Sequence, residues 1–124
     1  MLERLLVGHQ EYRILRTMNW DFTDRVMIIT GAGIGIGFEI ARQFILAGGA
    51  VVLNDIDPEM ASQAAKKLID LGGKCKAIVG DSSELVVIDQ MVESAINHFG
   101  HLDYVVANAG ITTFGDFLEY QAKD

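Results

Sequence analysis

Residues 26–37 read VMIITGAGIGIG, an apolar run (26–29) followed by a glycine-rich turn. A strand that leads into such a turn and then into a helix brings bare backbone up to a phosphate. Glycines lack the Cβ atoms that would block a close approach, and they permit positive φ. The first turn of the following helix adds unpaired N–H groups and the positive end of the helix dipole. The segment therefore predicts a phosphate-binding turn.

The first strand is predicted over residues 25–30 and lacks the alternation of a half-exposed strand. That pattern is typical of a parallel strand buried on both faces. The first helix is predicted over residues 35–47, with one face marked by Ile36, Ile40, Phe44 and Ile45. The second strand is predicted over residues 50–54.

Capping residues place the later helices. Asp57 is predicted to cap a second helix with Pro58 in its first position, and Gly72-Gly73 ends that helix. A short third strand is predicted over residues 76–79. The segment 81–84 reads DSSE, a capping-box pattern before a third helix. Helical spacing along that helix predicts one apolar face, made of Ile88, Met91, Val92, Ala95, Ile96 and Phe99.

A fourth strand is predicted over residues 102–107, so strands and helices alternate along the chain. Because parallel crossovers are right-handed, this alternation predicts an α/β fold with a Rossmann-like, doubly wound parallel sheet. The expected strand order is 3-2-1-4, truncated to about four strands. The fourth strand would then be an apolar edge, and exposed apolar edges pair with other chains. We therefore expect self-association.

Composition restricts the function classes. The 124 residues are 50% hydrophobic and carry 10 Lys or Arg against 17 Asp or Glu, a net charge of −7. This acidic balance argues against nucleic-acid binding. The single cysteine, Cys75, excludes an internal disulfide and a cysteine metal cluster. No apolar stretch reaches the roughly 18 residues that span a bilayer. We expect a cytoplasmic protein with no metal site and no membrane partner.

Residues 1–17 differ from the rest in composition, with charges scattered among apolar residues and no continuous apolar run. This pattern argues against a secretory signal. We interpret residues 1–17 as a non-native or mis-assigned extension, with Met18 as the natural start and 18–124 as the nucleotide-binding part. A genuine surface helix is the alternative.

The glycines follow the pattern T-G-x-x-x-G-x-G, made by Thr30, Gly31, Gly35 and Gly37. With its context, this pattern resembles the short-chain dehydrogenase/reductase family over about residues 20–120. The resemblance implies that the turn, including Gly33, Ile34 and Ile36, contacts a dinucleotide cofactor. Thr30 itself is expected to bond the backbone of its own turn.

Asp55 ends the second strand, where a carboxylate can accept both ribose hydroxyls of adenosine and repels a 2′-phosphate. The resemblance implies that NADP-preferring relatives carry a basic residue near here. This chain has Ile34, Asn54 and Ile56 at those positions. We therefore expect NAD to be preferred over NADP. A solvated turn carboxylate is the alternative for Asp55.

Two further segments of the sequence match the family's pattern. Asp81 follows the third strand, where the resemblance implies that an acidic residue faces the adenine amino group, with the backbone of Ser82 alongside. Asp81 could equally be only a helix cap. The loop Asn108-Ala109-Gly110 matches the end of the family's N-N-A-G pattern and is expected beside the cofactor's ribose. Ala107 replaces the first asparagine and removes some of its bracing.

The family's chemistry uses a serine and a Tyr-x-x-x-Lys pair, with the tyrosine as general acid/base. None of Tyr12, Tyr104 and Tyr120 has a lysine four residues later, so no catalytic residue is predicted here. Two function classes stay open. One is the NAD(H)-binding portion of an oxidoreductase acting on an alcohol or carbonyl substrate, inactive alone. The other is a non-catalytic nucleotide-binding or interaction module.

Overall fold

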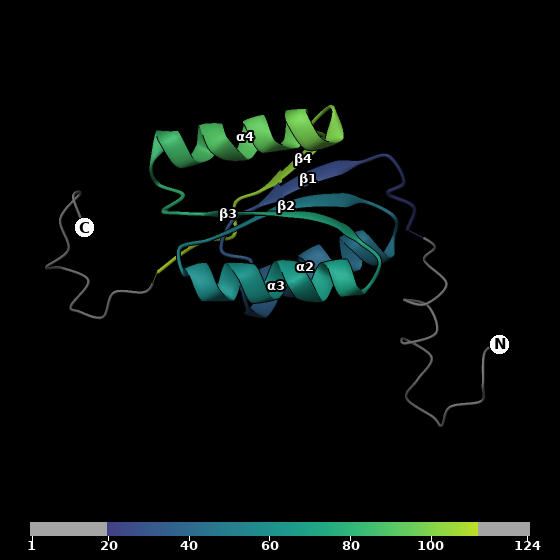
Figure 1. The fold of residues 1–124 in the computed structure, drawn as a ribbon, viewed down its shortest axis with the longest axis horizontal. Coiled ribbons are helices and arrows are strands. Elements are labelled where there is room, and N and C mark those ends of the chain that lie inside the picture. Colours follow the sequence, from purple (N-terminus) through teal and green to yellow (C-terminus); the bar gives the residue numbers. More distant parts are fainter. Residues whose placement is uncertain (1–19, 112–124) are drawn as a thin grey trace, which may run out of the picture.

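The computed structural model describes residues 20–111, in which strands and helices alternate along the chain (Figure 1). The strands are β1 (Val26–Ile29), β2 (Ala50–Asp55), β3 (Lys74–Val79) and β4 (Tyr104–Val106). The helices are α2 (Gly35–Leu46), α3 (Pro58–Asp70) and α4 (Leu85–Phe99). The predictions for residues 1–17, Met18 and residues 112–124 lie outside the described residues.

The four strands form one parallel sheet in the order β3-β2-β1-β4, which confirms the predicted fold class and strand order. Met27 of β1 pairs with Val51 on one side and with Tyr104 on the other. Both central strands are buried along their whole length. This burial explains why their sequences are continuously apolar instead of alternating.

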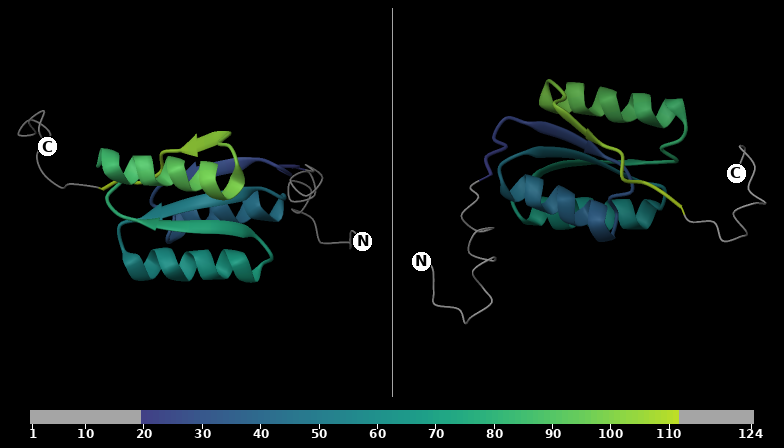
Figure 2. Two further views of the ribbon diagram at one scale, coloured as in Figure 1. Left: turned by 45° about the horizontal axis from the view of Figure 1, so that its top comes forward. Right: turned by 180° about the vertical axis from the view of Figure 1, so that it is seen from behind.

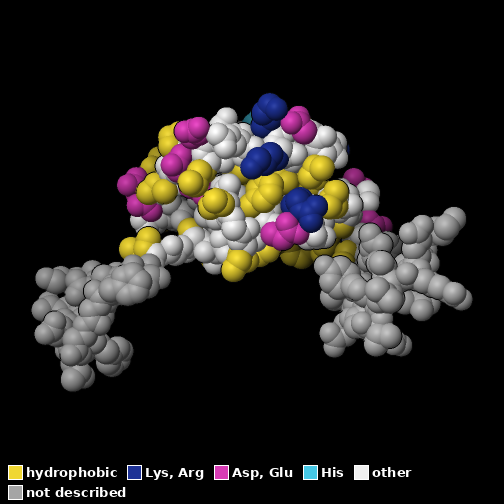
Figure 3. Space-filling model, turned by 90° about the horizontal axis from the view of Figure 1, so that it is seen from below, with side chains coloured by type: hydrophobic (Ala, Val, Ile, Leu, Met, Phe, Trp, Pro, Cys, Tyr) yellow, Lys and Arg dark blue, Asp and Glu magenta, His cyan; other side chains and the backbone are white. Residues whose placement is uncertain are grey.

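The sheet lies between two helical layers, with α2 and α3 on one face and α4 on the other (Figures 1 and 2). One apolar core joins α2 and α3 to strand residues that include Met27, Ile29 and Leu53. A smaller core joins α4 to strand residues that include Val26, Ile28 and Val52. Figure 3 views the α2 and α3 side, where hydrophobic side chains lie among charged ones. None of the helices in the described part of the chain is long and apolar enough to cross a membrane.

Helix α3 begins and ends as predicted. The Asp57 side chain accepts hydrogen bonds from the backbone N–H groups of Glu59 (2.9 Å) and Met60 (3.1 Å), and Pro58 is the first helical residue. After the helix, Gly72 adopts φ 85°, a conformation that stops a helix and that glycine adopts without a steric cost.

The predicted face of the first helix is partly wrong. Ile36 is 76% exposed, and the residues of α2 that are buried are Gly37, Ala41, Phe44 and Ile45. The reason is steric, since this end of α2 lies very close to the glycine turn. A Cβ on Gly37 would lie 2.7 Å from the carbonyl oxygen of Gly31. Only small residues fit there, so the apolar pattern of the isoleucines does not define the inner face.

The predicted face of the third helix is also shifted. Met91 and Ala95 are buried as expected, together with Val87 and Ser94, whereas Ile88, Val92 and Ile96 are 39%, 38% and 46% exposed. The buried face begins in the first turn of the helix, where Val87 packs beside Gly80. A Cβ on Gly80 would lie 2.7 Å from the Val87 side chain. Ile88, Val92 and Ile96 therefore lie at the border between the buried and the exposed face of α4.

The capping box predicted at 81–84 does not form. Helix α4 starts at Leu85 with Glu84 as its N-cap residue, and no side chain caps it. The Asp81 carboxylate instead accepts a hydrogen bond from the backbone N–H of Ser83 at 2.9 Å. This bond closes a turn that precedes the helix. The Asp81 carboxylate therefore lies before the N-cap position and does not cap α4.

Candidate functional site

A groove of about 540 Å³ lies at the carboxyl ends of the strands. Ligands bind at this edge in open α/β sheets, where the strand order reverses. The groove is lined by residues from each of the four segments that the sequence identified, namely the glycine turn, the end of β2, the turn after β3 and the loop after β4. These residues are Gly31, Asp55, Ile56, Asp81, Ser82, Asn108, Ala109 and Gly110. Asn54, Gly80, Ser83 and Ile111, which the sequence reasoning did not identify, also line it.

The glycine turn after β1 combines positive φ angles, close backbone contacts and an uncapped helix start. Gly31 and Gly35 adopt φ 62° and 68°, which L-residues rarely adopt. A Cβ on Gly31 would lie 2.8 Å from Cα of Ala109, so the turn and the loop after β4 touch through bare backbone. Helix α2 starts in this turn, and no side chain caps its first N–H groups. Uncapped N–H groups at a helix start are the donors that anion sites use.

The Asp55 carboxylate links the glycine turn to the end of β2. Its Oδ2 accepts a hydrogen bond from the backbone N–H of Gly33 at 2.9 Å, and its Oδ1 accepts one from Asp57 at 3.0 Å. The residue is 8% exposed. Each carboxylate oxygen has a second lone pair, so Asp55 keeps acceptor capacity toward the groove. The close fit also explains Gly33, where a Cβ would lie 2.6 Å from Oδ2 of Asp55.

The loop after β4 is held against the glycine turn by two side chains. The Asn108 amide donates to the carbonyl oxygens of Thr30 and Gly31, both at 3.2 Å. The Thr30 hydroxyl accepts hydrogen bonds from the backbone N–H groups of Asn108 (3.1 Å) and Ala109 (3.0 Å). Thr30 therefore bonds a loop far away in sequence, and the expectation that it bonds its own turn is wrong. The partners are separated by 78 and 79 residues, so local sequence could not identify them.

The turn after β3 forms the other wall of the groove. The N–H of Ser83 stabilises the ionised Asp81 carboxylate and lowers its pKa. This wall has a second determinant that the sequence reasoning missed, because the Asn54 amide donates to the carbonyl oxygens of Ile78 (3.0 Å) and Gly80 (2.9 Å). The signal was a polar residue at the end of an otherwise apolar strand.

Exposed isoleucines surround the groove and turn. Ile34 and Ile36 of the turn are 65% and 76% exposed, and Ile56 beside Asp55 is 67% exposed. Ile34, Ile36 and the remaining turn glycines lie outside the set of residues that line the groove. Gly37 is instead packed beneath the turn, where a Cβ would lie 2.5 Å from Nδ2 of Asn108. The predicted site thus divides into residues that line the groove, residues packed beneath the turn, and exposed isoleucines of the turn that do neither.

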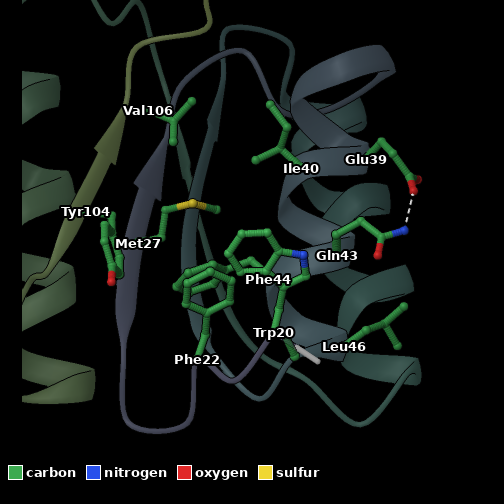
Figure 4. A pocket seen from close by; sticks show the side chains of 11 residues that line it. Trp20, Phe22, Met27, Glu39, Ile40, Gln43, Phe44, Leu46, Tyr104 and Val106 are labelled. Atoms are coloured by element: carbon green, nitrogen blue, oxygen red, sulfur yellow. Dashed lines mark hydrogen bonds between the residues drawn. The ribbon is translucent and has the colours of Figure 1, made fainter. Parts of the chain in front are cut away.

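A second hollow, of about 590 Å³, lies between α2 and β4 (Figure 4). Aromatic rings dominate it: Phe22 stacks on Phe44 with ring centroids 4.5 Å apart, and Tyr104 meets both rings edge-on at 5.9 Å. Of its charged groups, Glu39 is paired with Arg42 at 2.8 Å. The hollow offers apolar contacts and no array of backbone donors, so it does not compete with the groove as a phosphate site.

Other reactive side chains in the described residues lie away from the groove. Within residues 20–111, His, Cys, Asp and Glu form no group of three or more that could hold a metal ion. Cys75 is buried, and burial raises the pKa of its thiol to about 12. His101 donates through Nε2 to the carbonyl oxygen of Asp24 (2.7 Å), and the same nitrogen lies 2.9 Å from a carboxylate oxygen of Asp103. These contacts lie beside the start of β1, where Asp103 also accepts the N–H of Val26.

Sequence comparison agrees with this architecture. The family profile described as short chain dehydrogenase matches residues 25–124. An uncharacterized oxidoreductase of Thermotoga maritima is 36% identical over 104 residues, which cover 84% of this chain and 41% of that protein. Oxidoreductase UcpA of Escherichia coli is 35% identical over 102 residues, 82% of this chain and 38% of that protein. The chain thus spans about two fifths of the length of these curated relatives.

Solved structures give the same result. L-Sorbose reductase of Gluconobacter frateurii, solved in complex with NADPH and L-sorbose, is 29% identical with a TM-score of 0.78. The similarity covers 86% of this chain and 41% of that one. A mutant short-chain dehydrogenase/reductase of Serratia marcescens is 33% identical with a TM-score of 0.75, covering 83% of this chain and 42% of that one. With its profile match over residues 25–124, the chain belongs to the short-chain dehydrogenase family.

Proposed function

We propose that this chain is the NAD(H)-binding portion of a cytoplasmic oxidoreductase that acts on an alcohol or carbonyl substrate. The observation that carries the proposal is the glycine turn, in which Gly31 lines the groove without a Cβ atom and the helix that follows starts without a side-chain cap. A dinucleotide fits this donor set, because its pyrophosphate needs N–H donors and its ribose needs an acceptor. When bound, the nicotinamide ring supplies the hydride transfer.

Eight of the predicted residues would have roles in binding. Gly31 and Gly35 would let the backbone approach the pyrophosphate, and the first turn of α2 would donate to it. Asp55 would accept the ribose hydroxyls with its remaining lone pairs. Asp81 and Ser82 would face the adenine from the opposite wall. Ala109 and Gly110 would lie beside the second ribose, held there by Asn108. The roles of Gly31, Asp55, Asp81, Ser82, Asn108, Ala109 and Gly110 are supported by their positions around one groove. The role of Gly35 is supported by its positive φ at the uncapped start of α2.

The proposed preference for NAD over NADP rests on the charge of Asp55. A 2′-phosphate near this carboxylate would be repelled by roughly 1 kcal/mol per pair of unit charges at 4 Å in a water-like medium. No lysine or arginine lines the groove within the described part of the chain. The sorbose reductase that was solved with NADPH shows that a similar fold accepts the phosphorylated cofactor. The preference therefore depends on these side chains and not on the fold.

The test is a titration of the chain with NADH and with NADPH, followed by fluorescence or calorimetry. We expect NADH to bind about tenfold more tightly, and we expect Asp55→Ala to weaken NADH binding by ~1–3 kcal/mol. The Asp55→Ala variant should also lose the discrimination, because the repelling charge is gone. Tighter binding of NADPH by the unaltered chain would refute the preference.

We expect no turnover by these 124 residues alone. Hydride transfer to a carbonyl leaves an alkoxide that needs a proton, and the sequence contains no Tyr-x-x-x-Lys pair to deliver one. A panel of alcohols and sugars with NAD should therefore give no steady NADH production. Steady production that disappears in Tyr120→Phe would contradict this expectation.

A second candidate function is an interaction module, and it is favoured by the surface around β4. Tyr104 and Val105 are 42% and 64% exposed, and β4 pairs with β1 alone among the described strands. Its other edge offers backbone groups that a second strand can pair with. The apolar hollow in Figure 4 adjoins the same strand. We therefore propose self-association through this edge, which is compatible with dinucleotide binding.

A further inference from the structure

Asn54 is a polar residue at the end of an apolar, buried strand. It is 1% exposed. On the α4 side of β2, Ala50 and Val52 belong to the smaller core, and Asn54 continues the same alternating column. A buried amide has to be hydrogen-bonded to be tolerated. An apolar side chain at this position would bury no polar group, so the presence of an amide calls for a specific role.

The two hydrogen bonds of Asn54 define that role. Its Nδ2 donates to the carbonyl oxygen of Ile78 at 3.0 Å and to that of Gly80 at 2.9 Å. Two carbonyl oxygens around one amide atom identify that atom as the nitrogen, because a carbonyl can only accept. A single side chain from β2 thus holds both the end of β3, through Ile78, and the turn that follows it, through Gly80.

The two hydrogen bonds of Asn54 lie where the backbone pairing of β2 with β3 ends. The last paired residues of β2 and β3 are Asp55 and Val79, and the N–H of Gly80 still donates to the Asp55 carbonyl at 3.1 Å. Gly80 then adopts φ 150° and turns the chain into the groove. The Asn54 amide fixes the Gly80 carbonyl and therefore the direction in which Asp81 and Ser82 leave the strand.

The side chains of Asn54 and Asp55 bond opposite walls of the groove. Successive residues of a strand point to opposite faces of a sheet. Asp55 bonds Gly33 in the glycine turn, and Asn54 bonds Gly80 in the opposite turn. Both residues line the groove. Two neighbouring side chains at the end of one strand thus bond the two turns on either side of the groove.

We infer that Asn54 is a positioning residue for the adenosine end of the groove, acting through the β3–α4 turn that carries Asp81 and Ser82. This inference rests on the proposed nucleotide-binding function. It assigns to the Asn54 side chain the affinity for the adenosine portion of a ligand and not the affinity for its diphosphate. The side chains that hold the glycine turn are those of Asp55 and Asn108, and Asn54 bonds this turn only through its backbone carbonyl, which accepts the N–H of Ala32 at 2.8 Å.

The experiment compares two probes, ADP and inorganic pyrophosphate, by calorimetry on the full chain and on Asn54→Leu. Leucine has a similar size and no donor. We expect the Kd for ADP to rise about tenfold and the Kd for pyrophosphate to change by less than twofold. The matched control is Ser94→Ala, since Ser94 is another buried polar residue on the α4 side and lies outside the groove. It should change neither constant.

The outcomes separate the inference from the function. If the unaltered chain binds neither probe, the proposed function is refuted and the inference with it. If the unaltered chain binds ADP and Asn54→Leu binds it equally well, or loses both probes in parallel, only the inference is overturned. Should Asn54→Leu not fold, Asn54→Ser provides the test, since its short hydroxyl cannot span both carbonyls. A selective loss of ADP affinity supports the inference, and an unchanged ratio overturns it.

Discussion

Replacing Thr30 with valine tests whether the loop after β4 is held by the residue that joins β1 to the glycine turn. Valine keeps the shape of threonine and removes the hydroxyl, which accepts from the N–H groups of Asn108 at 3.1 Å and Ala109 at 3.0 Å. A net hydrogen bond contributes about 0.5–1.5 kcal/mol. Asn108 is half-buried, whereas Ala109 is exposed and can recover a bond to water. We therefore expect Thr30→Val to lower the free energy of unfolding by about 1–2 kcal/mol.

The assay is urea and thermal unfolding followed by circular dichroism. For a domain of this size, the expected loss corresponds to a decrease in the thermal midpoint of roughly 3–8 °C. Thr30→Ser is the matched control, because it keeps the hydroxyl and loses only a methyl group, so its effect should be clearly smaller. The reasoning is wrong if Thr30→Val is as stable as the unaltered chain, or if Thr30→Ser loses as much stability as Thr30→Val.

Three further predictions concern the edges of the fold. The Asp103 carboxylate accepts the N–H of Val26 at 2.8 Å, which lowers its pKa. Its stabilising effect is therefore present above the unfolded pKa of about 3.9 and is lost as the pH falls through the folded value. The stability difference between Asp103→Asn and the unaltered chain should shrink below about pH 4 in thermal midpoints, and a constant difference would contradict this. Val105→Lys should reduce self-association measured by light scattering, and an unaltered chain that stays monomeric at all concentrations would refute the edge proposal. Deleting residues 1–17 should shift the thermal midpoint by less than a few degrees, and a larger drop would show that the segment stabilises the fold.

The sheet could be predicted from sequence because its signals are local and agree with one another. Buried parallel strands are continuous apolar runs, and glycines mark where they end. The order of the strands could be expected from the order that Rossmann-like folds typically have, since the handedness of the crossovers alone does not fix it. The helix faces could be predicted less well. Periodicity identifies an apolar stripe, but it does not say that Gly37 and Ala41 must face the sheet because the backbone there passes too close for larger side chains.

The candidate site divides in the same way. The residues that line the groove could be found because they follow strand ends in a recognisable pattern. The residues that hold its walls could not, since Thr30 and Asn54 act on backbone groups up to 79 and 26 residues away. The carboxylate of Asp81 illustrates a third case, in which one short pattern is compatible with a helix cap and a turn. The hydrogen bond to Ser83 selects the turn.

The groove therefore depends on the register of the sheet as much as on its residues. Ile29 pairs with Leu53 on one side and with Val106 on the other, so the ends of three strands are aligned at one edge. A slip of β2 by one residue would exchange the faces of its side chains. The Asn54 amide would then face the glycine turn, and the Asp55 carboxylate would face two carbonyl oxygens. The two apolar columns of β2 prevent this slip, because each fills a different core and an exchange would misplace the whole strand. The buried core thus fixes the chemistry at the edge of the sheet.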